Sequence, residues 1–133
     1  MIYEYVLGRL KSVPILGADI YPVGVNIDDI YTADNDFAFT VYTFRSRTPV
    51  TDLDGELHHY RDEVIVDFIS RLYDKVHGMY DGASEALYVA CLDTGNGEWI
   101  QNAECLSTEP DAYDPEYGLY RRSMLVRIDW TPV

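Results

Sequence analysis

The chain has 133 residues, of which 47% are hydrophobic, and its 23 acidic and 10 basic residues give a formal net charge of −13. This length and apolar content predict one domain, residues 1–133, built around one core, and they exclude a chain that is disordered throughout. The negative charge excludes nucleic-acid binding over a broad face, because such a surface repels phosphates.

The N-terminal residues predict an amphipathic helix rather than a targeting segment. Residues 2–13, IYEYVLGRLKSV, place Ile2, Val6 and Leu10 near helical spacing, and Pro14 ends the pattern. The same stretch carries charges and lacks the apolar core of a signal peptide, so we expect a cytosolic, reduced setting. No uncharged apolar run approaches the roughly 18–20 residues of a membrane span, and we expect no membrane contact.

The next segments lead from polar chain into a strand. Residues 18–23 predict a brief extended segment that Pro22 stops, and the acidic residues 24–36 lack a period and predict a loop. Residues 37–50, FAFTVYTFRSRTPV, are rich in β-branched and aromatic residues and predict a strand. Because both of its faces are apolar over 37–44, we expect this strand to be central and covered on both sides.

An Asp-Gly pair at 54–55 predicts a turn between that strand and a second one. Residues 58–74 alternate in polarity, so that Val64, Val66 and Phe68 share one face. Two strands that flank such a turn should pair as a long antiparallel hairpin.

The second half of the chain predicts a helix and two further strands. In residues 75–92 the apolar positions recur every three or four residues, and Gly78 and Gly82 suggest that this helix packs closely on the sheet. Residues 99–108 and 119–130 alternate and predict strands that flank an acidic loop. The order of elements predicts a mixed α+β domain, in which an antiparallel (mixed) four-stranded sheet carries an N-terminal helix and a central helix.

We find no pattern that predicts catalysis, a cofactor or a bound metal. The acidic loop, residues 109–118, lacks the glycine and glutamate positions of a calcium-binding EF-hand loop. His58 and His59 are neighbours on a predicted strand, so their side chains should point to opposite faces rather than share a metal. Cys91 and Cys105 have no neighbouring cation that would activate a thiol. We therefore expect a protein that is not an enzyme, with a loop that is solvated or faces a partner.

Four segments share their layout with a known family. An N-terminal helix leads to IYP (20–22) and to the strand FTVYTF (39–44). A long strand, YRDEVIVDFISRLYD (60–74), runs into the helix VHGMYDGASEAL (76–87). In DAYDPEYGLYRRSMLVRIDW (111–130), a loop that ends in a Gly-Leu-Tyr-Arg step begins the closing strand. In this layout the chain resembles the small tail-terminator and tail-completion (minor tail) proteins of long-tailed bacteriophages.

The resemblance implies a structural protein without catalytic activity or cofactor. Such a protein forms a homo-oligomeric ring, usually a hexamer, that stops polymerisation of the tail tube and joins the tail to the head. Its partners would be further copies of itself, the tail-tube protein and the head or neck connector proteins. It would act at the tail–head junction of the virion, after assembly in the bacterial cytoplasm, and DNA would pass through the ring without specific binding.

Two other functions remain open from the sequence. A head–tail connector or neck protein is also a small acidic ring-former, and the sequence does not separate it from a terminator. An acidic inhibitor that mimics DNA is a more remote alternative, because the carboxylates here are spread over many segments rather than set in phosphate-like rows.

The acidic loop and the arginines around it are our candidates for an interface in such a ring. We expect a head-to-tail contact with a neighbouring subunit, or with a tail or neck protein. The predicted interface residues are Asp111, Asp114, Glu116, Tyr117, Arg71, Arg121, Arg122 and Arg127. The competing interpretation is that these charges pair within one subunit or are solvated.

Overall fold

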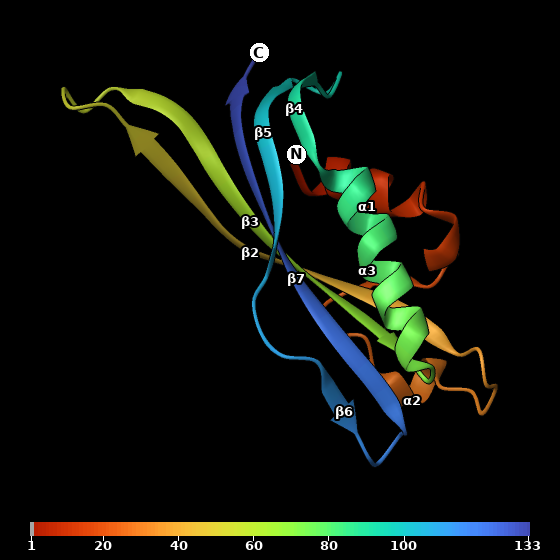
Figure 1. Ribbon diagram of the computed structural model, residues 1–133. Helices are drawn as coiled ribbons and strands as arrows, with labels where there is room; N and C mark the ends of the chain where they lie inside the picture. The colour runs from red at the N-terminus through yellow and green to blue at the C-terminus, as the bar shows by residue number, and fades with distance from the viewer. Residues whose placement is uncertain (1) are drawn as a thin grey trace.

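Within residues 2–133, which the computed structural model describes, seven strands form one mixed sheet (Figure 1). The strand order is β1-β2-β3-β7-β5-β4, and β6 lies beside the part of β7 that β5 leaves free. Only β1 and β2 pair in parallel. The elements are α1 (Ile2–Lys11), the 3-10 helix η1 (Pro14–Leu16), β1 (Ile20–Pro22), α2 (Ile27–Ile30), β2 (Ala38–Thr51), β3 (Leu57–Ser70), α3 (Tyr73–Leu87), β4 (Val89–Asp93), β5 (Glu98–Ser107), β6 (Ala112–Asp114) and β7 (Leu119–Pro132).

The mixed α+β class is confirmed, but the sheet has seven strands where we predicted four. The three additional strands are β1, β4 and β6. β1 and β6 have three residues each, too few for alternation to distinguish a strand from a loop. β4 was included in the predicted central helix, which ends earlier, since Tyr88 is already extended with φ −70° and ψ 116°.

The main core lies between the sheet and the two longer helices, which pack on the same face (Figure 1). Val64, Val66 and Phe68 of β3 have no exposed surface, as their alternation predicted. The helical stripes are confirmed as well, because every third or fourth residue of each helix is buried. The buried helical residues are Ile2, Val6 and Leu10 in α1 and Val76, Met79, Tyr80, Ala83 and Leu87 in α3.

β2 and β3 form the predicted hairpin around a turn at residues 52–56. The hairpin extends beyond the strand that supports it, because the pairing of β3 with β7 ends at Tyr60 and Trp130. The tip of the hairpin therefore projects from the rest of the domain (Figure 1). The expectation for β2 is confirmed in its first part, since Phe39 is buried on one face and Thr40 on the other, and β2 lies between β1 and β3 there. β1 pairs only with residues 40–42, so the rest of β2 is an edge of the sheet.

The close approach that Gly78 and Gly82 suggested exists, but its partner is not the sheet. A Cβ at Gly78 would lie 3.0 Å from Ile15 Cδ1, and one at Gly82 would lie 3.0 Å from Val13 Cγ1. These glycines therefore let α3 pack against the segment that contains η1, which connects α1 to β1.

Replacing Gly82 by leucine should lower the free energy of unfolding by about 1–3 kcal/mol, because overpacking displaces the buried and β-branched Val13. Gly8→Ala in α1 is the matched control. A Cβ at Gly8 meets nothing within 4 Å, so this substitution should stabilise the helix by about 0.5–1 kcal/mol. Urea unfolding of both variants tests the contrast, and an equal response would contradict the close approach.

Candidate interaction surface

The face of the sheet opposite α1 and α3, here called the open face, presents charged and apolar residues in rows across the strands. Neighbouring strands place Thr43, Ile65, Leu125 and Leu106 in one row. Leu106 keeps 37% of its surface exposed. Leu125 of this row is buried, so the row exposes apolar surface mainly at Leu106.

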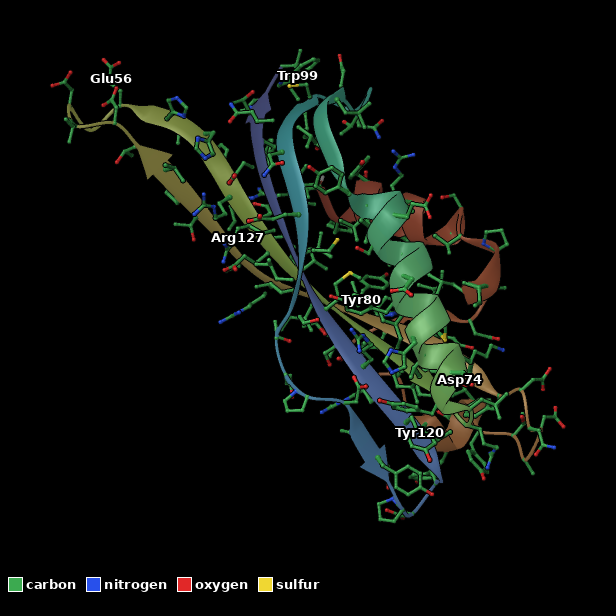
Figure 2. The ribbon with its side chains drawn as sticks, in the orientation of Figure 1. Glu56, Asp74, Tyr80, Trp99, Tyr120 and Arg127 are labelled. Atoms are coloured by element: carbon green, nitrogen blue, oxygen red, sulfur yellow. The ribbon has the colours of Figure 1, made fainter. Side chains whose placement is uncertain are left out.

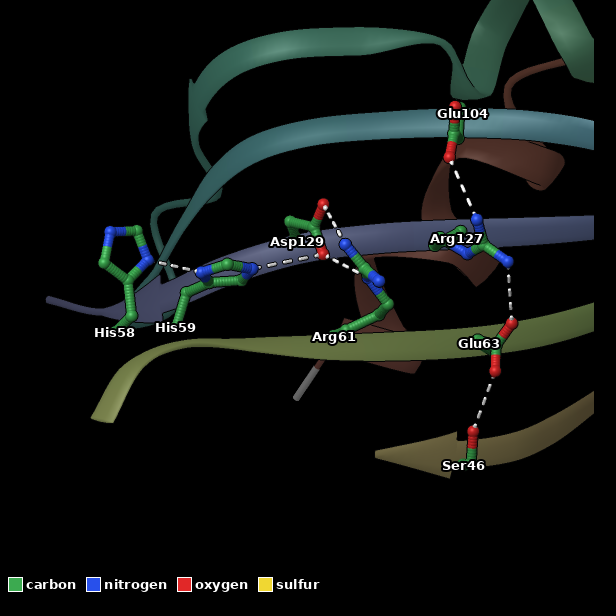
Figure 3. A network of polar contacts seen from close by, with 8 residues as sticks. All are labelled: Ser46, His58, His59, Arg61, Glu63, Glu104, Arg127 and Asp129. Atoms are coloured by element: carbon green, nitrogen blue, oxygen red, sulfur yellow. Dashed lines mark hydrogen bonds and ion pairs between the residues drawn. The ribbon is translucent and has the colours of Figure 1, made fainter. Parts of the chain in front are cut away.

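The next row is charged and runs across four strands, as Figure 3 shows. Arg127 lies 3.6 Å from Glu63 and 3.4 Å from Glu104, and Ser46 donates a hydrogen bond of 3.3 Å to Glu63. Arg127, which we predicted at an interface, is thus held between two carboxylates of its own subunit. Because these groups are partly exposed, each ion pair contributes only about 0–1 kcal/mol.

A second charged group lies nearer the hairpin tip (Figure 3). Arg61 donates a hydrogen bond of 2.8 Å to Asp129, and His59 Nε2 lies 3.5 Å from the same carboxylate. His58 and His59 do not point apart as we expected, since their Nδ1 atoms are 2.6 Å apart. β3 has already left β7 at this point, so the flat alternation of a supported strand no longer applies.

A groove of about 430 Å³ is cut into the end of the open face that carries α2 and β6. Its floor is apolar and includes Phe39, Ile69 and Leu119. The remaining lining residues are Ile27, Ala112, Tyr113, Asp114, Pro115 and Arg121. A concave apolar surface with a few polar groups at its margin is the usual form of a binding site.

Within the acidic loop, Asp111 is bound to its own subunit. It accepts a hydrogen bond of 2.8 Å from the Tyr73 hydroxyl, and its carboxylate lies 3.4 Å from Arg122 and 3.2 Å from His77. The hydrogen bond to Asp111 raises the pKa of Tyr73. Arg122 also stacks over the ring of Tyr80, 4.3 Å from its centroid. For Asp111 and Arg122 the geometry favours pairing within the subunit.

Tyr117 and Arg71 hold the segment before β2. The Tyr117 hydroxyl donates a 2.7 Å hydrogen bond to Asp28, which raises the pKa of Tyr117 to about 12. Arg71 donates to the backbone oxygens of Thr32 and Asp34, at 2.7 and 2.9 Å. The segment 24–36, which we predicted as a loop, contains the short helix α2. The hydrogen bonds of Tyr117 and Arg71 hold this segment against the rest of the domain.

Three of the eight residues that we predicted at an interface have charged side chains exposed to solvent. Asp114 and Glu116 are exposed, and Asp114 accepts a hydrogen bond from the backbone of Glu116. Arg121 is 47% exposed and lies 3.6 Å from Glu109, which is itself 55% exposed. These residues flank the groove and remain available to a partner, so their role in an interface stays a prediction.

Sequence reasoning missed the ion pair between Arg47 and the buried Asp62, although a signal was present. Each residue lies seven positions from the Asp54-Gly55 turn, so a hairpin centred there places them opposite each other. It missed the groove because four regions far apart in the chain line it, around residues 27, 39, 69 and 112–121, and no local sequence pattern indicates such a site.

The two cysteines differ in environment. Cys91 is exposed, whereas Cys105 is partly buried, and burial raises the pKa of the Cys105 thiol to about 11. A maleimide at neutral pH should therefore label Cys91 at least about tenfold faster than Cys105. Mass spectrometry of the time course, with Cys91→Ser as the control, measures both rates. Similar rates at the two thiols would contradict the burial of Cys105.

Neither a metal site nor a membrane span is found in residues 2–133. No three His, Cys, Asp or Glu side chains in this range come together as a metal would require. None of the helices in the same range combines the length and the apolar character needed to cross a bilayer.

Comparisons with known proteins show a shared fold and little shared sequence. No protein-family model matches the chain, and no curated protein sequence matches it. Among solved structures, a chain of the virion of native gene transfer agent (GTA) particle aligns with a TM-score of 0.63. The alignment covers 94% of this chain and 90% of that chain at 12% sequence identity. The likeness therefore concerns the fold over nearly the full length of both chains.

Proposed function

We propose that this chain is a structural protein of a phage-like virion, which caps and completes the tail tube as a homo-oligomeric ring and joins the tail to the head. The observation that carries the proposal is the match in fold to a virion chain over nearly the whole length of both. The layout shared with tail-terminator and tail-completion proteins supports the finer role. In this role the protein acts through its shape and contacts, without catalysis or a cofactor.

The arrangement of the surfaces is compatible with a ring. The groove is lined by residues of α2 and β6 among others, and these elements lie at one end of the molecule with the projecting hairpin at the other (Figure 1), so the two ends present different surfaces. Subunits with unlike contact surfaces associate head to tail, and such contacts form a ring where the rotation between neighbours closes. Six copies at −13 each would give a ring of about −78, whose field repels DNA in transit and so disfavours adhesion.

The set of predicted interface residues is therefore reduced from eight to three. We propose that Asp114, Glu116 and Arg121 contact the neighbouring subunit or an adjoining tail or neck protein, since they are exposed beside the groove. The other five residues would support that surface from within, because their side chains bind groups of their own subunit.

The test is negative-stain microscopy of the purified protein mixed with tail tubes from the phage or prophage that encodes it. A terminator should add density at one end of each tube, and tubes from a deletion strain should exceed the normal length. Density on filled heads with bare tubes would instead indicate the connector function. Binding to neither tubes nor heads, together with unchanged tails after deletion, would refute the proposal.

A further inference from the structure

The tip of the β2–β3 hairpin presents an apolar side chain to solvent. Leu53 is fully exposed, at 106% of its reference surface, and Leu57 is 48% exposed. The turn that carries Leu53 is well ordered by hydrogen bonds. The Asp52 side chain accepts from the backbone of Asp54 and Glu56, and Gly55 takes the positive φ of 82° that the turn needs. A braced turn with an outward leucine is suited to insertion into a partner.

The stem of the same hairpin is protected against pairing with another strand. Its free edge carries Pro49, which lacks an N–H, and a bulge between Phe44 and Ser46 that distorts the ladder. Arg45 adds an exposed charge at the bulge. Proteins use these devices to prevent strand addition at an edge. The tip is therefore the part of the β2–β3 hairpin that remains suited to contact with another protein chain.

The groove at the opposite end of the molecule complements this tip. Figure 2 places Glu56 at the hairpin end and Tyr120, beside the groove residue Arg121, at the other end. The volume of about 430 Å³ and the apolar floor suit a leucine side chain and its turn. Asp54 and Glu56 of an inserted tip would place negative charge at the rim of the groove, where Arg121 is about half exposed.

The groove also has a negative residue, Asp114, which must be counted against this match. The Asp114 side chain already accepts a hydrogen bond of 2.9 Å from the backbone of Glu116, and that bond offsets part of its charge. Arg121 has only a long contact of 3.6 Å with the exposed Glu109, so the acidic tip can displace Glu109 at little cost.

We propose that Leu53 of one copy inserts into the groove of the next copy, with Asp54 and Glu56 beside the neighbour's Arg121. The occupant of the groove is thus a second copy of this chain, and the inference rests on the ring of the proposed function. Because tip and groove lie at opposite ends, no subunit satisfies its own groove. The contact is head to tail, and each subunit contributes one tip and one groove.

Disulfide trapping tests the contact directly. Leu53→Cys and Ala112→Cys are combined in a Cys91→Ser/Cys105→Ala background, where both new thiols are at the surface or in the groove. Oxidation should give a ladder of covalent multimers on a non-reducing gel. Each single variant should give dimers at most, and the mismatched pair of Leu53→Cys with the exposed Tyr88→Cys should give no ladder.

A charge exchange supplies a second readout. Leu53→Ser and Arg121→Glu should each raise the concentration needed for assembly by about tenfold or more, with unfolding midpoints unchanged, because both residues are exposed. Adding Asp54→Lys and Glu56→Lys to Arg121→Glu should restore assembly.

The possible outcomes separate this contact from the virion role. If the cysteine variant forms rings or occupies tube ends but gives no ladder of covalent multimers, the contact between tip and groove is overturned and the proposed function stays intact. A ladder from protein that never associates with virions would support the contact and overturn the function. Chains that stay monomeric and uncrosslinked, both alone and with tail tubes, would overturn both.

Discussion

Replacing Arg47 by alanine should lower the free energy of unfolding by about 3 kcal/mol, because it leaves the carboxylate of Asp62 buried without its cation. Asp62 has no exposed surface, and Arg47 binds it through two parallel hydrogen bonds of 3.0 Å. These bonds raise the pKa of Arg47. The guanidinium is 32% exposed, which places the expected loss at the lower end of the range for buried pairs.

Aromatic rings hold the same guanidinium in place. Arg47 lies 4.9 Å from the centroid of Trp130 and 5.9 Å from those of Tyr60 and Phe44. Lysine lacks the planar fork that makes these contacts together with the two hydrogen bonds, so Arg47→Lys should recover only part of the loss. The pair thereby fastens the root of the projecting hairpin to the C-terminal strand.

Urea unfolding measures the effect, with Arg45→Ala as the matched control. Arg45 is exposed at the β2 bulge, and its replacement should change the free energy of unfolding by less than about 0.5 kcal/mol. The double variant Arg47→Met/Asp62→Leu should regain most of the stability, since it removes both charges together. If Arg47→Ala and Arg45→Ala behave alike, the Asp62 carboxylate is solvated and the pair has no structural role.

The elements predicted correctly are those whose signal is local. The alternation of Val64, Val66 and Phe68 and the stripe of Val76, Met79 and Ala83 follow from side-chain geometry within one strand or helix. An Asp-Gly pair likewise sufficed for the hairpin, because it specifies the turn chemically.

The features missed depend on contacts between distant segments. β6 is a strand only because β7 supplies its partner, and the groove exists only where α2, β2, β3, β6 and β7 meet. The acidic loop shows the same limit. Its composition indicated a charged surface, but only the fold distinguishes Asp111, which is bound to Tyr73, from Asp114, which is exposed.

That difference predicts opposite results for two charge reversals in the loop. Asp111→Lys should lower the free energy of unfolding by about 1.5–3 kcal/mol, because it removes the hydrogen bonds to a charged acceptor and places a cation beside Arg122. Asp114→Lys should lower it by about 1 kcal/mol at most, because this side chain is exposed in β6 and loses only its hydrogen bond from the backbone of Glu116.

Assembly should respond in the reverse order. If the loop contributes to the ring contact, the double variant Asp114→Lys/Glu116→Lys should change the sedimentation coefficient of the assembled protein at low salt. The change should be smaller at high salt, where exposed charges are screened. A double reversal that leaves both stability and sedimentation unchanged would remove the exposed half of the loop from the interface. A loss of stability with Asp114→Lys alone as large as that with Asp111→Lys would show that Asp114 also supports the fold, through its hydrogen bond from the backbone of Glu116. The two measurements together therefore assign each carboxylate of the loop either to holding the subunit or to joining it to its neighbours.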